Sequence, residues 1–275
     1  MKRAFINKKV SNILLAIFIV ATFMVSLCSC KNETIIDDDD NRSVITIGSS
    51  DYPPFMDLDN NGNPTGIDVD ILEEAFDRIG YDIRFVTISW ENKDDLLKSK
   101  DIDCVTGGFT INGREDDYLW IGPYMNSNQV IVVNKGSGID SLNDLNGKTI
   151  AVQSSSAAET ILLERSNSNI PEDIQILSYE DNMLLFAALN SNYIDAFVAD
   201  EPVVVQYMKD YETNFIVLDE PLINASVGTA FALDGDAELC KKVNDAIDEM
   251  KKDGTLQEII ENYLDDASRY IEGEE

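Results

Sequence analysis

Short apolar runs rich in β-branched residues alternate along the chain with longer segments in which apolar positions recur at helical spacing. Residues 44–48 favour a strand, and the apolar stripe within 71–79 favours a helix that we expect to begin at Asp68 as its N-cap and to end at Gly80. The same alternation continues to the C-terminal region, which predicts an α/β protein.

The remaining predicted elements repeat this order. We expect strands at 82–87, 102–106, 129–133, 148–152, 174–177, 194–199, 215–218 and 227–233. We expect helices at 94–99, 157–165, 183–189, 237–252 and 256–264, with one more starting at Glu201-Pro202. The strand at 102–106 should end in Gly107-Gly108. Because the strand–helix order restarts after residue 133, the pattern predicts two similar lobes rather than one long sheet.

The first thirty residues have the order of a signal peptide. Four basic residues precede an uncharged apolar run from Ile13 to Leu27. This run has 15 residues, whereas a membrane-spanning helix needs about 20. The following Leu27-Cys28-Ser29-Cys30 resembles a bacterial lipobox, so we expect cleavage after residue 29 and lipidation, including palmitate, at Cys30. The alternative is an ordinary secretory signal in which Cys30 is incidental. Two acyl chains would suffice for stable membrane attachment.

Charge and composition exclude several classes of function. The 275 residues include 21 basic and 51 acidic ones and no His, which excludes catalysis by His and zinc bound through His. Removal of residues 1–29 leaves 17 basic residues and a formal charge of −34, so we expect no nucleic-acid partner. A ligand binder, a carboxylate-based enzyme and an adhesive module remain open.

Residues 30–43 predict a flexible acidic tether. A calcium site at its run Asp37–Asp40 is the weaker interpretation, because consecutive carboxylates lack the spacing of a Ca²⁺ loop. We expect no metal and no cofactor. The folded part contains two cysteines, Cys104 and Cys240. We expect both to be free buried thiols, although export would permit a disulfide.

Several ordered motifs between Ile45 and Leu264 resemble those of the extracellular solute-binding proteins of polar amino-acid ABC importers (family 3). They are Ile47-Gly48 through Tyr52-Pro53-Pro54-Phe55, Gly66-Ile67-Asp68-Val69-Asp70, Ile102-Asp103-Cys104 through Gly107-Gly108-Phe109-Thr110, Gly122-Pro123-Tyr124, Val198-Ala199-Asp200-Glu201-Pro202 and Lys252-Asp253-Gly254-Thr255-Leu256. The resemblance implies the periplasmic-binding-protein-like type II fold, in which two lobes are joined by two crossover strands and the ligand is held between them. It places 44–130 and 228–275 in lobe one, with the C-terminal helices packed there, and 131–227 in lobe two.

Two charged residues are the main candidates for binding an amino acid. Arg114 matches the family arginine that grips the α-carboxylate, and its planar guanidinium suits bidentate pairing. Its loop is one residue shorter than in most relatives, and the alternative is a surface Arg paired with a neighbouring acid at 115–117. Asp200 matches the acidic residue that binds the α-ammonium, although an N-cap role for the following helix is a strong alternative.

Smaller groups complete the predicted ligand site. Ser155 and Ser156 precede a helix whose backbone N–H groups could face an anion, with Ser155 where the family usually has Gly and with Ser156 also suited to an N-cap. Gly108 and the Thr110 hydroxyl should contribute from lobe one. The resemblance also places aromatic residues against the ligand, and Trp90 between Ser89 and Glu91 is poorly placed for burial. The aromatic candidates are Tyr52, Trp90 and, less favoured, Phe55.

These features predict a monomeric, lipid-anchored receptor on the extracytoplasmic face of the cell membrane. It would capture a free polar amino acid by hinge closure and deliver it to an ABC permease with its ATPase. One alternative is a carboxylate-based, dehydratase-like enzyme on the same fold, with Glu91 or Glu201 as general acid. Another is a ligand-sensing or adhesive lipoprotein. The sequence does not choose between cationic and neutral side chains, although Asp51 or Glu91 could hold a cation.

Overall fold

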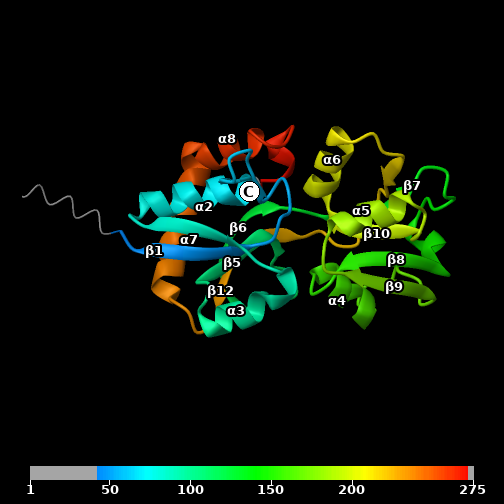
Figure 1. The fold of residues 1–275 in the computed structure, drawn as a ribbon, viewed down its shortest axis with the longest axis horizontal. Helices are drawn as coiled ribbons and strands as arrows, with labels where there is room; N and C mark the ends of the chain where they lie inside the picture. Colours follow the sequence, from blue (N-terminus) through cyan, green and yellow to red (C-terminus); the bar gives the residue numbers. More distant parts are fainter. Residues whose placement is uncertain (1–41, 272–275) are drawn as a thin grey trace, which may run out of the picture. The chain divides into compact units, whose positions relative to one another are not determined.

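The computed structural model describes residues 42–271. The predicted signal peptide, the lipidation site Cys30 and nearly all of the predicted tether lie outside these described residues. Two five-stranded mixed sheets form the framework (Figure 1). We call the sheet that contains the first strand, with its helices, lobe one, and the other sheet with its helices lobe two.

In lobe one the strand order is β4 (Asp82–Thr87), β1 (Val44–Ser49), β5 (Cys104–Thr110), β12 (Ser226–Ala232) and β6 (Tyr118–Asn126). In lobe two it is β11 (Phe215–Val217), β7 (Gln129–Asn134), β10 (Ala196–Asp200), β8 (Lys148–Gln153) and β9 (Ile174–Tyr179). A short hairpin of β2 (Asp57–Leu58) and β3 (Pro64–Thr65) follows β1. Strands β1, β4 and β5 are parallel, as are β8, β9 and β10, so the ends of several strands meet at one edge of each sheet.

The helices cover these sheets with their apolar faces. Lobe one carries α2 (Ile67–Arg78), α3 (Lys93–Ser99), α7 (Ala237–Asp253) and α8 (Thr255–Glu261), and lobe two carries α4 (Ala157–Glu164), α5 (Met183–Asn190) and α6 (Glu201–Asp210) (Figure 1). Helix α7 buries Val243, Ile247 and Met250 and packs on β6 and α2. The C-terminal helices therefore pack on lobe one, as the resemblance implied.

Two neighbouring segments connect the lobes. The chain passes from β6 to β7 at residues 127–128 and returns from lobe two to β12 just before Ser226. These segments are hydrogen-bonded to each other, because Ser127 N donates to Ala225 O at 2.7 Å and Gln129 N donates to Ile223 O at 3.0 Å. Both crossings lie a few residues earlier than the sequence limits of 130 and 228. Two adjacent extended connections are suited to act as a hinge.

Three local expectations differ from the structure. Strand β5 does not end at Gly107-Gly108 but runs through both to Thr110. Helix α2 begins at Ile67 with Gly66 as N-cap, so Asp68 lies inside the first turn and is fully buried. Strand β6 was not predicted, because Gly122-Pro123 interrupts its apolar pattern. Within residues 42–271 no helix has both the length and the apolar character needed to cross a bilayer.

Candidate functional site

Asp200 ends β10 at the boundary between the lobes and is 3% exposed. Its Oδ1 accepts a hydrogen bond from Ser127 Oγ at 2.6 Å, and its Oδ2 accepts one from the Tyr52 hydroxyl of lobe one at 2.8 Å. Burial raises the pKa of Asp200 to about 6, and these hydrogen bonds limit the rise. The carboxylate is thus ionised at neutral pH and lies where both lobes can reach it.

The N-cap alternative for Asp200 is wrong as far as its side chain is concerned. Asp200 is the residue before α6, yet its side chain makes no capping hydrogen bond. Both carboxylate oxygens are engaged by Ser127 and Tyr52 instead. The proline expected near the helix start is present at Pro202. The side chain of Asp200 is therefore directed toward the lobe boundary rather than to its own helix.

Arg114 lies in a tight turn after β5, and its guanidinium is directed across the lobe boundary. Its Nη2 donates to the Ser155 carbonyl of lobe two at 3.2 Å, and its Cζ lies 5.3 Å from the centre of the Phe109 ring. Burial lowers the pKa of Arg114, but an arginine remains charged. Within the described residues no ion pair joins Arg114 to an acid at 115–117, so the surface alternative is wrong.

Ser155 and Ser156 shape the lobe-two side of the site. Ser155 has φ of 59°, the left-handed conformation in which glycine is favoured, and its N–H donates to Glu159 Oε2 at 2.7 Å. Ser156 Oγ accepts from Glu159 N at 3.1 Å, so its N-cap role is confirmed. The Ser155 N–H is therefore engaged by Glu159, whereas the Ser156 hydroxyl hydrogen stays available to an anion.

Asp68 holds the strand segment that carries Gly107 and Gly108, a role that sequence reasoning missed. Its Oδ2 accepts hydrogen bonds from Thr106 Oγ1 at 2.6 Å, Gly107 N at 2.8 Å and Gly108 N at 3.0 Å. Gly108 has φ of +64°, and a Cβ there would lie 2.8 Å from the Phe55 ring. Asp68 and the two glycines thus fix the backbone that leads to Thr110.

Seven of the ten predicted ligand-binding residues line one small cavity between the lobes. They are Tyr52, Trp90, Gly108, Thr110, Arg114, Ser156 and Asp200. The cavity volume is about 30 Å³, room for about two water molecules. Gln129 and Asn182 also line it and were not foreseen, since a polar residue in a strand or loop has no sequence signal that marks it as a ligand contact.

Three predicted residues do not line this cavity. Ser155 reaches it only through its carbonyl, which Arg114 contacts. Phe55 is fully buried and packs beneath Gly108. Glu91 is exposed and lies outside the cavity. The structure therefore concentrates the candidate site on fewer side chains than the sequence suggested.

Trp90 is buried, contrary to the expectation from its polar neighbours. It is 6% exposed and meets Phe109 edge-on, with ring centres 4.9 Å apart. Lys93, one turn later, is 3% exposed, lies over the Trp90 ring at 5.2 Å, and approaches Ser155 O at 3.4 Å. Burial lowers the pKa of Lys93, and the nearby Arg114 contributes to this. An aromatic wall thus supports the cationic side of the site.

The two remaining cysteines are free and buried. Cys104 lies in β5, and the Cys240 thiol donates to Trp120 O at 3.2 Å from α7. Both therefore serve lobe one as packed side chains, as the sequence predicted.

Comparison with known proteins extends this picture. The chain is 28% identical over 255 residues to the arginine-binding extracellular protein ArtP of Bacillus subtilis (strain 168), covering 91% of this chain and 97% of that protein. It is 28% identical over 268 residues to the L-cystine-binding protein TcyJ of Escherichia coli (strain K12), covering 96% of this chain and 98% of that protein. An ancestral arginine-binding protein bound to arginine superposes with a TM-score of 0.73 at 30% identity, covering 82% of this chain and 99% of that one.

The family model for bacterial extracellular solute-binding proteins, family 3, matches residues 45–266. This range includes both connections, every residue that lines the small cavity and, except for Val44, every residue of the two five-stranded sheets. From sequence, fold and coverage together, the chain belongs to the bacterial extracellular solute-binding proteins of family 3.

Proposed function

We propose that this protein captures a free polar amino acid between its lobes and delivers it to an ABC importer. The observation that carries the proposal is the placement of Arg114 and Asp200 on one cavity, with Arg114 from lobe one and Asp200 from lobe two. A free α-amino acid presents a carboxylate and an ammonium on one carbon. Arg114 supplies the donors for the first group, and Asp200 supplies the anion for the second.

Ligand binding is coupled to closure of the hinge. Only when the lobes approach do Arg114 and Asp200 both reach the same small molecule, so the ligand stabilises the closed arrangement. The hinge would lie at the two connections, so that lobe one ends before residue 127 and resumes at Ser226, a few residues earlier than the sequence limits of 130 and 228. The Ser156 hydroxyl and the Thr110 hydroxyl complete the polar surface, while Tyr52 and Trp90 provide the aromatic walls.

The cavity must widen before an amino acid can enter. Its volume of about 30 Å³ suits about two water molecules. The hydrogen bonds that span the lobes at this point include those from Tyr52 to Asp200 and from Arg114 to Ser155 O. An incoming ammonium replaces the Tyr52 hydroxyl at Asp200, and an incoming carboxylate replaces the Ser155 carbonyl at Arg114. The ligand thereby takes over contacts that the protein otherwise makes with itself.

The enzyme alternative has less support than binding. Glu91 is exposed and outside the cavity, and Glu201 accepts from Arg269 Nη2 at 2.9 Å without lining the cavity. ArtP and TcyJ are named as binding proteins. Mass spectrometry of the bound amino acid after long incubation tests this point, and conversion to a product would favour the enzyme.

We also propose the cellular setting. Members of the family are extracellular, and the leader 1–29 with lipidation at Cys30 would retain this protein at the outer face of the cell membrane. The acidic tether 30–43 would give the lobes freedom to meet a permease. Replacing Cys30→Ala should release the protein from the membrane fraction, and unchanged retention would contradict lipid attachment.

A ligand screen tests the proposed function directly. Thermal stability should rise with at least one of the twenty amino acids, cystine or ornithine. Charged hydrogen bonds contribute about 1.5–3 kcal/mol each, so Arg114→Ala should weaken the affinity for that ligand at least about tenfold in calorimetry. Arg84→Ala, at an exposed arginine on β4, is the matched control. Equal affinity in the wild type and Arg114→Ala would contradict the proposal.

A further inference from the structure

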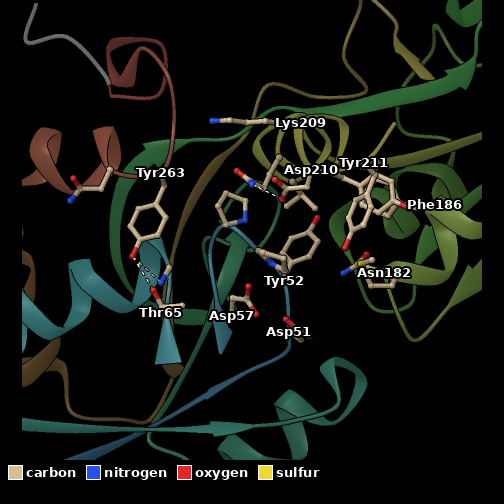
Figure 2. A pocket seen from close by; sticks show the side chains of 18 residues that line it. Asp51, Tyr52, Asp57, Thr65, Asn182, Phe186, Lys209, Asp210, Tyr211 and Tyr263 are labelled. Carbon is tan, nitrogen blue, oxygen red and sulfur yellow. Dashed lines mark hydrogen bonds between the residues drawn. The ribbon is translucent and has the colours of Figure 1, made fainter. Parts of the chain in front are cut away.

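A second, larger cavity lies between the lobes (Figure 2). It shares lining residues with the first cavity. Its volume is about 440 Å³, within the range of pockets that hold small molecules. Lobe one contributes the loop around Tyr52 and the hairpin beside Thr65, and lobe two contributes α5 and α6. Tyr52 and Asn182 line both cavities, so the two cavities meet at these residues. A group that extends from the Asp200 site past Tyr52 therefore enters the larger cavity.

The larger cavity carries an excess of negative charge. Three carboxylates line it, Asp51, Asp57 and Asp210, against one ammonium, Lys209. Gln206 Nε2 donates to Asp210 at 2.6 Å. Figure 2 shows Asp51 and Asp57 together on the side away from Lys209. Burial, with Asp57 as a nearby like charge, raises the pKa of Asp51, and a cation between these carboxylates would relieve that repulsion.

Aromatic rings also line the larger cavity. Phe186 and Tyr207 stack with ring centres 3.9 Å apart, and Tyr207 and Tyr211 follow at 4.6 Å. These residues and Tyr52 all line the cavity. Ring faces attract guanidinium and ammonium groups, and the attraction increases when the cation is withdrawn from water. A cavity lined by both carboxylates and aromatic rings is therefore suited to a flat or extended cation.

Asn182 provides an independent indication of a polar ligand. It is 6% exposed and precedes α5, yet its amide makes no capping hydrogen bond. Asp181 caps Met183 N instead, at 2.8 Å. Within residues 42–271 the Asn182 amide has no hydrogen-bond partner, and it borders both cavities. The residue is largely buried, but its amide atoms are not among the enclosed polar atoms without a partner and face the cavities. A polar group of the ligand can therefore take up these free hydrogen-bonding positions.

We propose that the larger cavity receives the side chain of the bound amino acid and selects a long, positively charged one, with Asn182 and Asp51 as specificity-determining residues. This inference rests on the proposed function, because the α-carboxylate and α-ammonium must first be held at Arg114 and Asp200. It assigns the ligand to the class of basic amino acids with a guanidinium or ammonium at the end of the side chain.

Calorimetry with L-arginine and L-citrulline tests the inference. Citrulline has nearly the same shape as arginine but a neutral urea group in place of the guanidinium. We expect one arginine per chain and an affinity at least tenfold higher than for citrulline, after amino acids carried through purification are removed. Equal affinities, or tighter binding of a neutral amino acid, would overturn the charge selection while leaving the proposed function intact.

Two variants test the roles proposed for Asp51 and Asn182. Asp51→Asn should lower the ratio of arginine to citrulline affinity at least threefold, and Asn182→Ala should weaken arginine binding about tenfold. Asp219→Asn, at an exposed carboxylate outside both cavities, is the matched control. No effect in either cavity variant, or two arginines per chain, would overturn the inference. Failure of every amino acid to bind would refute the proposed function and the inference with it.

Discussion

The buried carboxylate of Asp200 should reduce the stability of the ligand-free protein at neutral pH. Its folded-state pKa of about 6 lies above the ordinary value of 3.8, and burial is the main cause. A group with a raised pKa stabilises the fold in its protonated form, fully below pH 3.8, and this contribution is lost as the pH rises through about 6. Replacing Asp200→Asn removes the ionisation and should abolish that loss.

The magnitude follows from the difference between the two pKa values. The difference between about 6 and 3.8 corresponds to about 3 kcal/mol, since a tenfold change in an equilibrium constant is about 1.4 kcal/mol. Asp200 is 3% exposed, so solvent screening reduces this little. Because part of the loss is already present at pH 4, the free energy of unfolding of Asp200→Asn minus that of the wild type should rise by about 2–3 kcal/mol between pH 4 and pH 8.

Urea unfolding of both proteins at pH 4, 5, 6, 7 and 8 measures this difference. Other titrating groups contribute equally to both proteins, so the difference isolates position 200. The change should centre between pH 4 and 6. A difference that stays constant with pH would refute the reasoning, because the carboxylate would then not be destabilised by burial.

Three further predictions follow from the same site. Ligand affinity should fall about tenfold between pH 7.5 and pH 5, because the ammonium requires ionised Asp200; calorimetry at both pH values checks this, and a flat profile would exclude Asp200 as the counter-ion. Asp68→Ala should lower the free energy of unfolding by at least about 3 kcal/mol, because it leaves buried donors such as Gly107 N and Gly108 N without an acceptor. Urea unfolding measures this loss of stability, and a loss below about 1 kcal/mol would contradict the prediction. Ser155→Gly should stabilise the protein by about 1 kcal/mol, because glycine adopts the left-handed conformation without strain. The melting temperature should therefore rise. A lower melting temperature would mean that the Ser155 side chain stabilises the fold by more than its backbone strain destabilises it.

Much of the fold was predictable because its elements are locally encoded. Strand β4 has the predicted limits of 82–87, and α4, α5 and α7 differ from their predicted ends by one residue at most. Strand β6 was missed because its pairing with β12 overrides the break at Gly122-Pro123. The N-cap expected at Asp68 failed because long-range hydrogen bonds to the 106–108 backbone outweigh local capping chemistry.

The candidate site also has residues that could be predicted from the sequence and residues that could not. Motif resemblance singled out Arg114, Asp200 and Tyr52, and the structure brings all three to one cavity. Burial of Trp90 depends on Phe109, which is distant in sequence, so its polar neighbours gave the wrong expectation. Asn182 could not be identified from sequence, because its position before α5 predicts a capping side chain. In the structure Asp181 accepts the hydrogen bond from Met183 N instead, which leaves the Asn182 amide free within the described residues.

The most direct test of the account is a crystal structure of the protein with the amino acid that binds it most tightly. We expect the α-carboxylate of the ligand within hydrogen-bonding distance of the Arg114 guanidinium and its α-ammonium within hydrogen-bonding distance of the Asp200 carboxylate, with both lobes in contact with one molecule. A ligand bound outside this cleft, or one that engages neither Arg114 nor Asp200, would contradict the account.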